Sequence, residues 1–331
     1  GEIAYEYNGR RHTLDDYLEH QRVTALLILK DDRVIVERYR YDRQPADRFL
    51  SFSMAKSIVS MLAGIALDKG ILSSLDDPAA KYVPELAGSG YGNATIGQLL
   101  RMSSGVKFVE QYDGRDDIAR LRRARLGASA ESPLEVLASF REQSFPAGEK
   151  MGYSSAETAV VGYVLARAAQ QNLATLTAQW LWQPLGAEAE ASWQIGIDGQ
   201  EQAEGGFNAT LRDYARLGWL LAHDGRRGPM QIVPAAYLLD ATDPTRQPEA
   251  FRPRAATPYF GYGYQFWLFP MRSRTFALLG IYGQSIFVQP ESKIVMVHTA
   301  AYANPKQPDA TIERDALWRG VLAILGGNPQ P

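Results

Sequence analysis

Strand-forming segments lie near both ends of the chain and helical patterns fill its middle, and this distribution constrains the fold more than any other sequence feature. Near the start, the apolar runs Ala25–Lys30 and Val34–Val36 flank Asp31-Asp32, a pattern typical of a β-hairpin. In the last third, short β-rich segments are separated by Gly or Pro, namely Tyr262–Phe269, Thr275–Ile281, Ser285–Val288 and Ile294–Thr299. We therefore expect an antiparallel sheet built from both ends of the chain.

The helical patterns have recognisable start and stop signals. Met54–Leu67 is long and apolar and is followed by Lys69-Gly70, which predicts a buried helix. The charged stretch Arg115–Arg125 is compatible with an exposed loop or with a mobile helix. Further helices are predicted at Thr95–Met102, at the capping box Ser132–Glu135, and at Ser154–Ala169, Thr210–His223 and Ile312–Leu325.

These elements predict an α/β fold, in which an antiparallel sheet from both termini is flanked by helices and carries an inserted all-helical lobe. The predicted division assigns residues 1–75 and 205–331 to the α/β lobe and residues 76–204 to the helical lobe, within a single domain. A chain of 331 residues can bury a large core without disulfides. A site is expected in the groove between the lobes.

Composition and missing motifs exclude several classes of protein. The sequence has no cysteine, which rules out disulfides, thiolate catalysis and Cys-ligated metals. Lys and Arg number 35 against 37 Asp and Glu, which gives no basic field for nucleic acid, and no apolar run approaches the ~20 residues of a membrane span. HExxH, GxSxG and phosphate-binding glycine motifs are absent. We expect a small-molecule substrate, no metal and no cofactor; the oligomeric state stays open.

Ser-x-x-Lys occurs twice, and its context separates the two copies. Ser104-Gly105-Val106-Lys107 contains a glycine that breaks helical spacing, so Ser104 is interpreted as a turn or cap residue. Ser53-Met54-Ala55-Lys56 lies at the start of the long apolar helix, where a spacing of three residues places Ser53 and Lys56 on one face. The helix start favours an alkoxide, and a neutral, buried lysine can take the serine proton. The alternative is a helix cap beside a snorkelling lysine.

Two further elements would complete such a site. Tyr153-Ser154-Ser155 lies at another helix start, where the tyrosine can relay a proton to a leaving group, although an aromatic staple with a Ser cap is the alternative. Leu278–Gln284 is a strand that ends in closely spaced glycines. A backbone N–H there can join the N–H of Ser53 as an oxyanion donor, although a plain β-turn is the alternative.

In this order and spacing, the three elements resemble the penicillin-recognising serine hydrolases, which include serine β-lactamases, D-Ala-D-Ala peptidases and related esterases. The class C-like branch, with family VIII carboxylesterases and 6-aminohexanoate-dimer hydrolases, is more similar, over about residues 20–325. The segments that carry this likeness are Phe52–Ser57, Val106–Tyr112, Gly205–Thr210 with Asp213, and Gly280–Gln284. The resemblance implies a two-lobed α/β fold.

The resemblance also implies roles for individual residues. Ser53 would be the nucleophile, Lys56 its activating partner and Tyr153 the proton relay. The N–H groups of Ser53 and Ile281 would form the oxyanion hole. Tyr112 matches a tyrosine that closes over the substrate in the dimer hydrolases, although a solvated loop aromatic is the alternative.

Several positions depart from the family pattern and bear on the substrate. Leu278-Leu279-Gly280 replaces the Lys-Thr-Gly whose cation and hydroxyl bind a substrate carboxylate, and His298-Thr299-Ala300 on the next strand is assigned to the core. The remaining departures are Ser155 in place of an Asn, Tyr282 where the dimer hydrolases often have His, and Glu204 before the Gly205-Gly206 pair. These three residues and Gly280 are candidate substrate contacts. An apolar third motif favours esters or uncharged amides over β-lactams.

The sequence therefore predicts a serine hydrolase that works through an acyl-enzyme on small carboxylic esters or amides. One alternative is a β-lactamase or D-Ala-D-Ala peptidase, and another is a non-catalytic binding or sensor module on the same fold. The chain starts at Gly1 rather than Met, which allows for a removed leader. With the family resemblance, this favours a periplasmic or secreted location, with the cytoplasm as the alternative.

Overall fold

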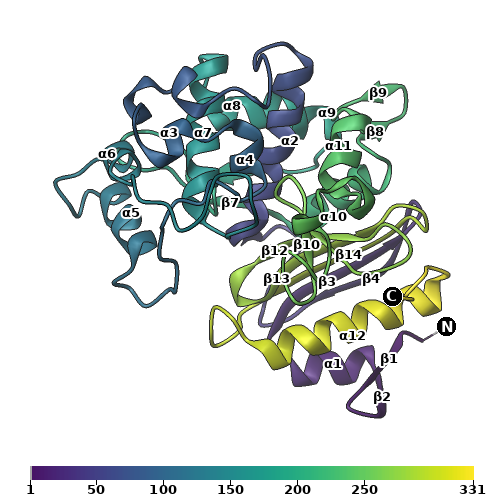
Figure 1. The fold of residues 1–331 in the computed structure, drawn as a ribbon. Coiled ribbons are helices and arrows are strands. Elements are labelled where there is room, and N and C mark those ends of the chain that lie inside the picture. Colours follow the sequence, from purple (N-terminus) through teal and green to yellow (C-terminus); the bar gives the residue numbers. More distant parts are fainter. Residues whose placement is uncertain (1) are drawn as a thin grey trace.

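A seven-stranded antiparallel sheet organises the molecule, and its strand order is β10-β11-β12-β13-β14-β3-β4. The computed structural model describes residues 2–331 (Figure 1). The strands are β3 (Val23–Lys30), β4 (Arg33–Tyr39), β10 (Gly261–Tyr262), β11 (Trp267–Leu268), β12 (Phe276–Gly280), β13 (Gln284–Gln289) and β14 (Ile294–Ala300). In this order β3 pairs with β14, so the sheet joins the two ends of the chain as predicted.

Alternate residues of each strand face opposite sides of the sheet, so the sheet has two cores. In β3, Leu27 and Leu29 belong to the core on the side of α2 and α10, whereas Leu26 and Ile28 belong to the core on the side of α12. Figure 1 shows α1 (Leu14–His20) and α12 (Pro308–Leu325) along one face, with α10 (Leu211–Ala222) over the other. α12 begins at Pro308, about one turn before the predicted start at Ile312.

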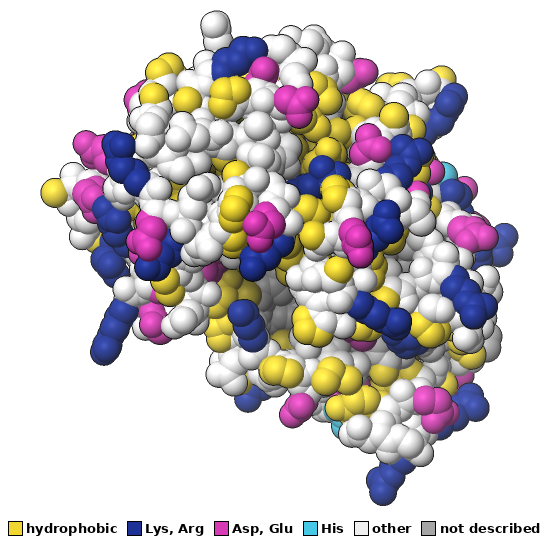
Figure 2. All heavy atoms as spheres, in the orientation of Figure 1, with side chains coloured by type: hydrophobic (Ala, Val, Ile, Leu, Met, Phe, Trp, Pro, Cys, Tyr) yellow, Lys and Arg dark blue, Asp and Glu magenta, His cyan; other side chains and the backbone are white. Residues whose placement is uncertain are grey.

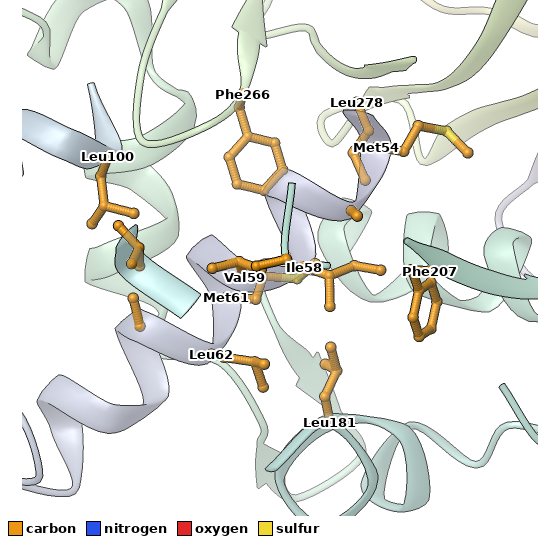
Figure 3. Packing of buried hydrophobic residues seen from close by; sticks show 14 of the residues in the cluster. Met54, Ile58, Val59, Met61, Leu62, Leu100, Leu181, Phe207, Phe266 and Leu278 are labelled. Carbon is orange, nitrogen blue, oxygen red and sulfur yellow. The ribbon is translucent and has the colours of Figure 1, made fainter. Parts of the chain in front are cut away.

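Helix α2 (Ala55–Asp68) is buried along almost its entire length, as its apolar sequence predicts. Figure 3 shows Ile58 and Leu62 of α2 surrounded by side chains from segments far apart in the sequence, including Phe207 and Leu278. At Gly64 a Cβ atom would lie 2.4 Å from the ring of Tyr237, so only glycine allows α11 (Ala235–Thr242) to pack this closely. The packing of α11 therefore fixes the second half of α2.

The regular structure between α2 and α10 consists mostly of helices, joined by long loops. Its helices are α3 (Gly90–Asn93), α4 (Ile96–Leu100), α5 (Asp117–Arg125), α6 (Pro133–Ala138), α7 (Ser155–Ala169), α8 (Leu173–Leu176) and α9 (Gln183–Leu185), with a π-helical turn at Thr177–Trp182. The stretch Arg115–Arg125 forms α5, and it is not fully exposed because Leu121, Ala124 and Arg125 are buried. The helix start predicted at Thr95 and the capping box predicted at Ser132 are present, and Thr95 also forms a capping box.

Most of the secondary-structure elements that the sequence did not predict are short strands. β1 (Ala4–Tyr7) and β2 (Arg10–Thr13) form a hairpin at the N-terminus, and β8 (Arg226–Arg227) pairs with β9 (Met230–Gln231). A three-stranded sheet has the order β5-β7-β6, from β5 (Arg48–Leu50), β7 (Phe207–Thr210) and β6 (Ser192–Trp193). The predicted single strand Tyr262–Phe269 is instead β10 and β11 around a turn, because Gln265 adopts a φ of 65°.

Acidic and basic side chains are interspersed over the face drawn in Figure 2. Such mixing agrees with the near balance of charge in the sequence. Among residues 2–331, no helix combines the length and apolar character needed to cross a membrane.

Candidate active site

Ser53 and Lys56 meet where a short 3₁₀ turn, Phe52–Met54, leads into α2. The Lys56 amine donates to the Ser53 hydroxyl oxygen at 2.7 Å and to the backbone carbonyl of Glu204, also at 2.7 Å. Lys56 is 2% exposed, whereas Ser53 is only partly buried. The structure thus brings the predicted pair into direct contact, with the serine open to a substrate and the lysine enclosed.

Gly280 brings the end of β12 against the segment that carries Ser53. A Cβ atom at Gly280 would lie 2.5 Å from the carbonyl oxygen of Ser51 and 3.1 Å from Cβ of Phe52, so a side chain has no room there. β11 pairs only with the first two residues of β12, which leaves the last part of β12 unpaired on that side. The residues predicted to supply the oxyanion donors, Ser53 and Ile281, therefore lie on two segments in close contact.

Two residues with left-handed backbone conformations flank these predicted donors. Phe52 has a φ of 45° and Tyr282 a φ of 61°, and each is adjacent in sequence to a predicted donor. Such conformations are strained for residues other than glycine and are often found at functional sites. The rings of Phe52 and Tyr282 lie 5.3 Å apart, so each helps to hold the other in place. Tyr282 thus lies at the predicted oxyanion hole.

Tyr153 lies beside the Ser53–Lys56 pair with its ring towards the lysine. The Lys56 amine is 5.2 Å from the centre of the Tyr153 ring. Trp267 stacks on this ring at 5.5 Å, and Tyr262 meets it edge-on at 6.5 Å. The hydrogen bonds found within residues 2–331 include none from the Tyr153 hydroxyl, and catalytic hydrogen bonds often tighten only when substrate binds.

Glu110, which sequence reasoning missed, links two of the predicted substrate contacts. Its carboxylate accepts from the Ser155 hydroxyl at 2.5 Å, from the Ser155 N–H at 2.7 Å and from the Tyr112 hydroxyl at 2.9 Å. Burial, followed by the Glu110 charge, raises the pKa of Tyr112 above its usual range. The signal available in the sequence was a glutamate two residues before Tyr112. Ser155 and Tyr112 thus contact one carboxylate near Tyr153.

The side chain of Glu204 is bound by Arg125, the last residue of α5. Arg125 donates to both carboxylate oxygens of Glu204, and its Nη2 lies 2.9 Å from Oε2. Arg125 and Glu204 are both almost completely buried. Burial lowers the pKa of Arg125 to about 10, so the guanidinium remains charged at neutral pH. Glu204 therefore meets Lys56 through its backbone and Arg125 through its carboxylate.

The segment that replaces Lys-Thr-Gly is apolar in the structure as well as in the sequence. Leu278 is fully buried and packs with Met54 and Phe266 in the core around α2 (Figure 3). On the neighbouring strand β14, His298 is also fully buried, and burial lowers its pKa to about 3. Its Nδ1–H donates to the Gly283 carbonyl at 2.6 Å. His298 is therefore a neutral core residue, as predicted.

Two pockets open elsewhere on the molecule. One, of about 460 Å³, lies between β3, β4 and α10, and its lining includes Trp219 and Arg212. The other, of about 480 Å³, lies beside the π-helical turn, and Trp182 and Phe207 line it. Neither of these two pockets is lined by a residue of the Ser53–Lys56–Tyr153 group.

Comparison with known proteins identifies the family. A family model described as Beta-lactamase matches residues 11–317 of this chain. The chain belongs to the beta-lactamase family. The resemblance inferred from the sequence motifs is thereby confirmed, and membership places this protein in a family of hydrolases.

Relatives of this beta-lactamase family member support the same placement. The 6-aminohexanoate-dimer hydrolase of Paenarthrobacter ureafaciens is 28% identical over 303 residues, which cover 88% of this chain and 76% of that protein. The structure of a candidate 6-aminohexanoate-dimer hydrolase from Bacillus anthracis has a TM-score of 0.88 at 23% identity, over 99% of this chain and 86% of that one. EstCE1, a hydrolase with promiscuous acyltransferase activity, has a TM-score of 0.71 at 17% identity, over 92% and 96% of the two chains. These structures confirm the fold.

Glu157, in the first turn of α7, is a buried acid of this family member that sequence reasoning missed. It is 1% exposed, and one carboxylate oxygen accepts from the backbone N–H of Ser104 at 2.8 Å. Burial raises its pKa to about 8, against about 4.5 for an exposed glutamate. The folded protein therefore holds a proton on Glu157 at neutral pH that the unfolded chain releases.

We expect Glu157→Gln to remove a pH dependence of stability. Between about pH 4.5 and 8, unfolding of the wild type releases the Glu157 proton, so its stability falls as pH rises, by at most about 1.4 kcal/mol per pH unit from this group. Glutamine cannot titrate, so the variant should gain on the wild type as pH rises to 8. The measurement is the free energy of unfolding by urea at pH 5 and pH 8, and Glu149→Gln, at an exposed glutamate, is the control. Parallel pH curves for wild type and Glu157→Gln would contradict this prediction.

Proposed function

We propose that this protein is a serine hydrolase that acts through an acyl-enzyme on Ser53. The observation that carries the proposal is the 2.7 Å contact between the Ser53 hydroxyl and an amine that is 2% exposed. An amine in direct contact with a serine hydroxyl is placed to accept the hydroxyl proton as the serine attacks. Membership of a hydrolase family adds to this argument.

The proposed reaction has two halves. In the first, the Ser53 oxygen attacks the substrate carbonyl, Lys56 accepts the serine proton, and the N–H groups of Ser53 and Ile281 stabilise the oxyanion. Collapse of this intermediate expels the alcohol or amine, which receives its proton through Tyr153, and leaves an ester on Ser53. In the second half, water attacks the ester and gives up a proton through Tyr153 to Lys56. Collapse of the second intermediate breaks the bond to Ser53 and releases the acid, and Lys56 returns the proton to the Ser53 oxygen.

The surroundings of Ser53 favour uncharged carboxylic esters and amides. Leu278 and Leu279 offer no cation or hydroxyl to a substrate carboxylate, and Leu278 is fully buried. The Glu110 carboxylate holds both polar groups of Ser155, at the position where lactamases of this branch have an amide side chain. A negatively charged β-lactam would meet this carboxylate without a compensating cation from the third motif. Acyl transfer to Ser53 also agrees with the names of two similar proteins, a 6-aminohexanoate-dimer hydrolase and a hydrolase with promiscuous acyltransferase activity.

Two alternatives and one structural division remain to be tested. A β-lactamase or peptidase activity is the first alternative, because the family and several structural neighbours carry those names. A non-catalytic binding module is the second, and the contact between Ser53 and Lys56 counts against it.

We also propose that residues 1–75 with 205–331 and residues 76–204 form the two lobes, because the site draws on both stretches.

The deciding experiment measures hydrolysis of a short-chain aryl ester and of a chromogenic cephalosporin in parallel. We expect turnover of the ester at a kcat/KM well above that for the cephalosporin, and an acylating phosphonate probe should label Ser53. A cephalosporin kcat/KM equal to or above that for the ester would favour the β-lactamase alternative. Absence of turnover and of labelling on intact, folded protein would favour a binding module.

A further inference from the structure

The carbonyl of Glu204 that accepts from Lys56 belongs to an irregular segment between two short strands. This segment, residues 194–206, turns at Gln202, whose carbonyl accepts from the N–H groups of Gly205 and Gly206 at 3.2 and 2.8 Å. The two glycines that follow Glu204 leave the backbone with few side-chain contacts of its own. The position of the Glu204 carbonyl therefore depends on what holds the Glu204 side chain.

Arg125 is the group that holds it, and Arg125 is itself fixed on several sides. Arg125 contacts both oxygens of the Glu204 carboxylate, and its backbone carbonyl accepts from the Ile197 N–H at 2.9 Å. Tyr163, whose hydroxyl donates to Asp198 at 2.5 Å, adds a second polar pair beside the guanidinium. Arg125 thus connects the end of α5 to the carbonyl that holds the Lys56 amine.

The other end of α5 holds the loop that carries Tyr112. The helix begins after Asp116, whose Oδ2 accepts from the backbone N–H groups of Gln111 and Tyr112 at 2.6 and 2.8 Å. Tyr112 has a φ of 60°, a conformation that needs such support. One helix of nine residues therefore positions a predicted substrate contact at its start and the predicted base at its end.

We infer that Arg125 is a positioning residue, which fixes the Lys56 amine on Ser53 by clamping Glu204, and that α5 sets the positions of Lys56 and Tyr112 together. The inference rests on the proposed function, since it assumes that Lys56 acts as the base. Arg125 would act by fixing the position of the Glu204 backbone carbonyl, which accepts a hydrogen bond from Lys56. A displacement of about 1 Å of a catalytic group can lower a rate about 100-fold, so such a clamp has a measurable effect.

The charged groups around Lys56 and around Arg125 form two separate sets. Lys56 faces Ser53, the ring of Tyr153 and the carbonyl of Glu204. The wider site contains the Glu110–Tyr112 pair, Glu157 and Tyr262. Arg125 faces Glu204, Tyr163 and Asp198. With Arg125 present, the charge of Glu204 is compensated. Without Arg125, the Glu204 carboxylate loses both of its contacts to the guanidinium, and the clamp on the Glu204 carbonyl is lost with them.

The test compares four variants with the wild-type chain. In Arg125→Met/Glu204→Leu the buried pair becomes apolar, a change that usually preserves stability. We expect this variant to fold, with kcat for the aryl ester reduced about tenfold or more and KM changed less than about threefold. In Arg125→Met alone, we expect at least as large a loss of kcat, because the buried Glu204 carboxylate is left without its partner. Arg125→Lys should recover part of kcat. The control is Arg120→Met/Glu131→Leu, which removes the other ion pair of α5 and should leave kcat unchanged.

Asp116→Asn gives a second readout that a merely structural role of α5 would not produce. It should raise KM through Tyr112 with little change in kcat, whereas the Arg125 variants should lower kcat with little change in KM. A folded Arg125→Met/Glu204→Leu variant with wild-type kcat would overturn the inference. The rate of Ser53 labelling by the phosphonate probe distinguishes failure of the proposed function from failure of the inference about Arg125. Failure to label the wild type would contradict the proposed function itself. Equal labelling rates in wild type and double variant would contradict only the role of Arg125.

Discussion

Replacing Ser53 with alanine is expected to lower kcat/KM for a short-chain aryl ester by about 10⁴-fold or more, because loss of the nucleophile removes the acyl-enzyme path. The oxyanion donors and the substrate pocket would remain, so a small residual rate above that of water is expected. The measurement is initial-rate kinetics on purified protein, with mass spectrometry to show that the phosphonate probe no longer attaches. Stability should change little, since Ser53 is only partly buried.

Ser104→Ala is the matched control for this prediction, because the chain contains a second Ser-x-x-Lys. There Lys107 is exposed and pairs with Glu142 at 3.1 Å, while the Ser104 hydroxyl oxygen accepts from the Val106 N–H at 3.2 Å. No serine–lysine contact is made at this copy within the part of the chain that the structure describes. We expect Ser104→Ala to retain activity. Loss of activity in Ser104→Ala, or its retention in Ser53→Ala, would refute the assignment of the nucleophile.

The parts of the candidate site that the sequence predicted are those set by local geometry or by a motif. Ser53 and Lys56 are one helical turn apart, so any helix at this point brings them together. Gly280 was also predicted, because a glycine at the end of a strand signals close backbone approach. These inferences needed no knowledge of distant contacts.

The missed parts depend on contacts between residues far apart in the sequence. Arg125 and Glu204 are separated by 79 positions, and Glu110 and Ser155 by 45. Nothing in a charged stretch such as Arg115–Arg125 indicates which arginine will be buried, because its partner is supplied by another segment. The same limit applies to Glu157, whose pKa is set by burial rather than by its neighbours in the sequence.

The fold shows the same division between local and distant causes. Helix caps, glycine stops and short apolar runs between turn residues predicted α2, α7, α10 and the strands β3, β4, β12, β13 and β14 of the main sheet. The turn that splits the predicted strand Tyr262–Phe269 was not predictable, because Gln265 has no conformational preference for it. Its left-handed conformation is stabilised by contacts with three helices, and these contacts make Gln265 a target for mutation.

Gln265 joins the turn between β10 and β11 to three helices, and it is 2% exposed. Its side-chain amide donates to the carbonyls of Leu99 and Leu100 at the end of α4, at 3.2 and 2.7 Å. Its side-chain oxygen accepts from Thr158 of α7 at 2.5 Å, and its backbone carbonyl accepts from Ser57 of α2 at 2.6 Å. Gln265 therefore connects α2, which carries Lys56, to α7, which begins just after Tyr153.

We expect Gln265→Leu to lower the free energy of unfolding by about 3 kcal/mol, because three buried side-chain hydrogen bonds are lost and the Thr158 hydroxyl is left without its acceptor. Gln231→Leu is the matched control: this glutamine also donates to two backbone carbonyls, each at 2.7 Å, but it is exposed, so water can replace its bonds. Its expected loss is less than about 1 kcal/mol. Urea unfolding followed by circular dichroism measures both variants. Equal losses in the two variants would show that burial does not set the cost of removing Gln265 and would contradict its role in joining the turn to the three helices.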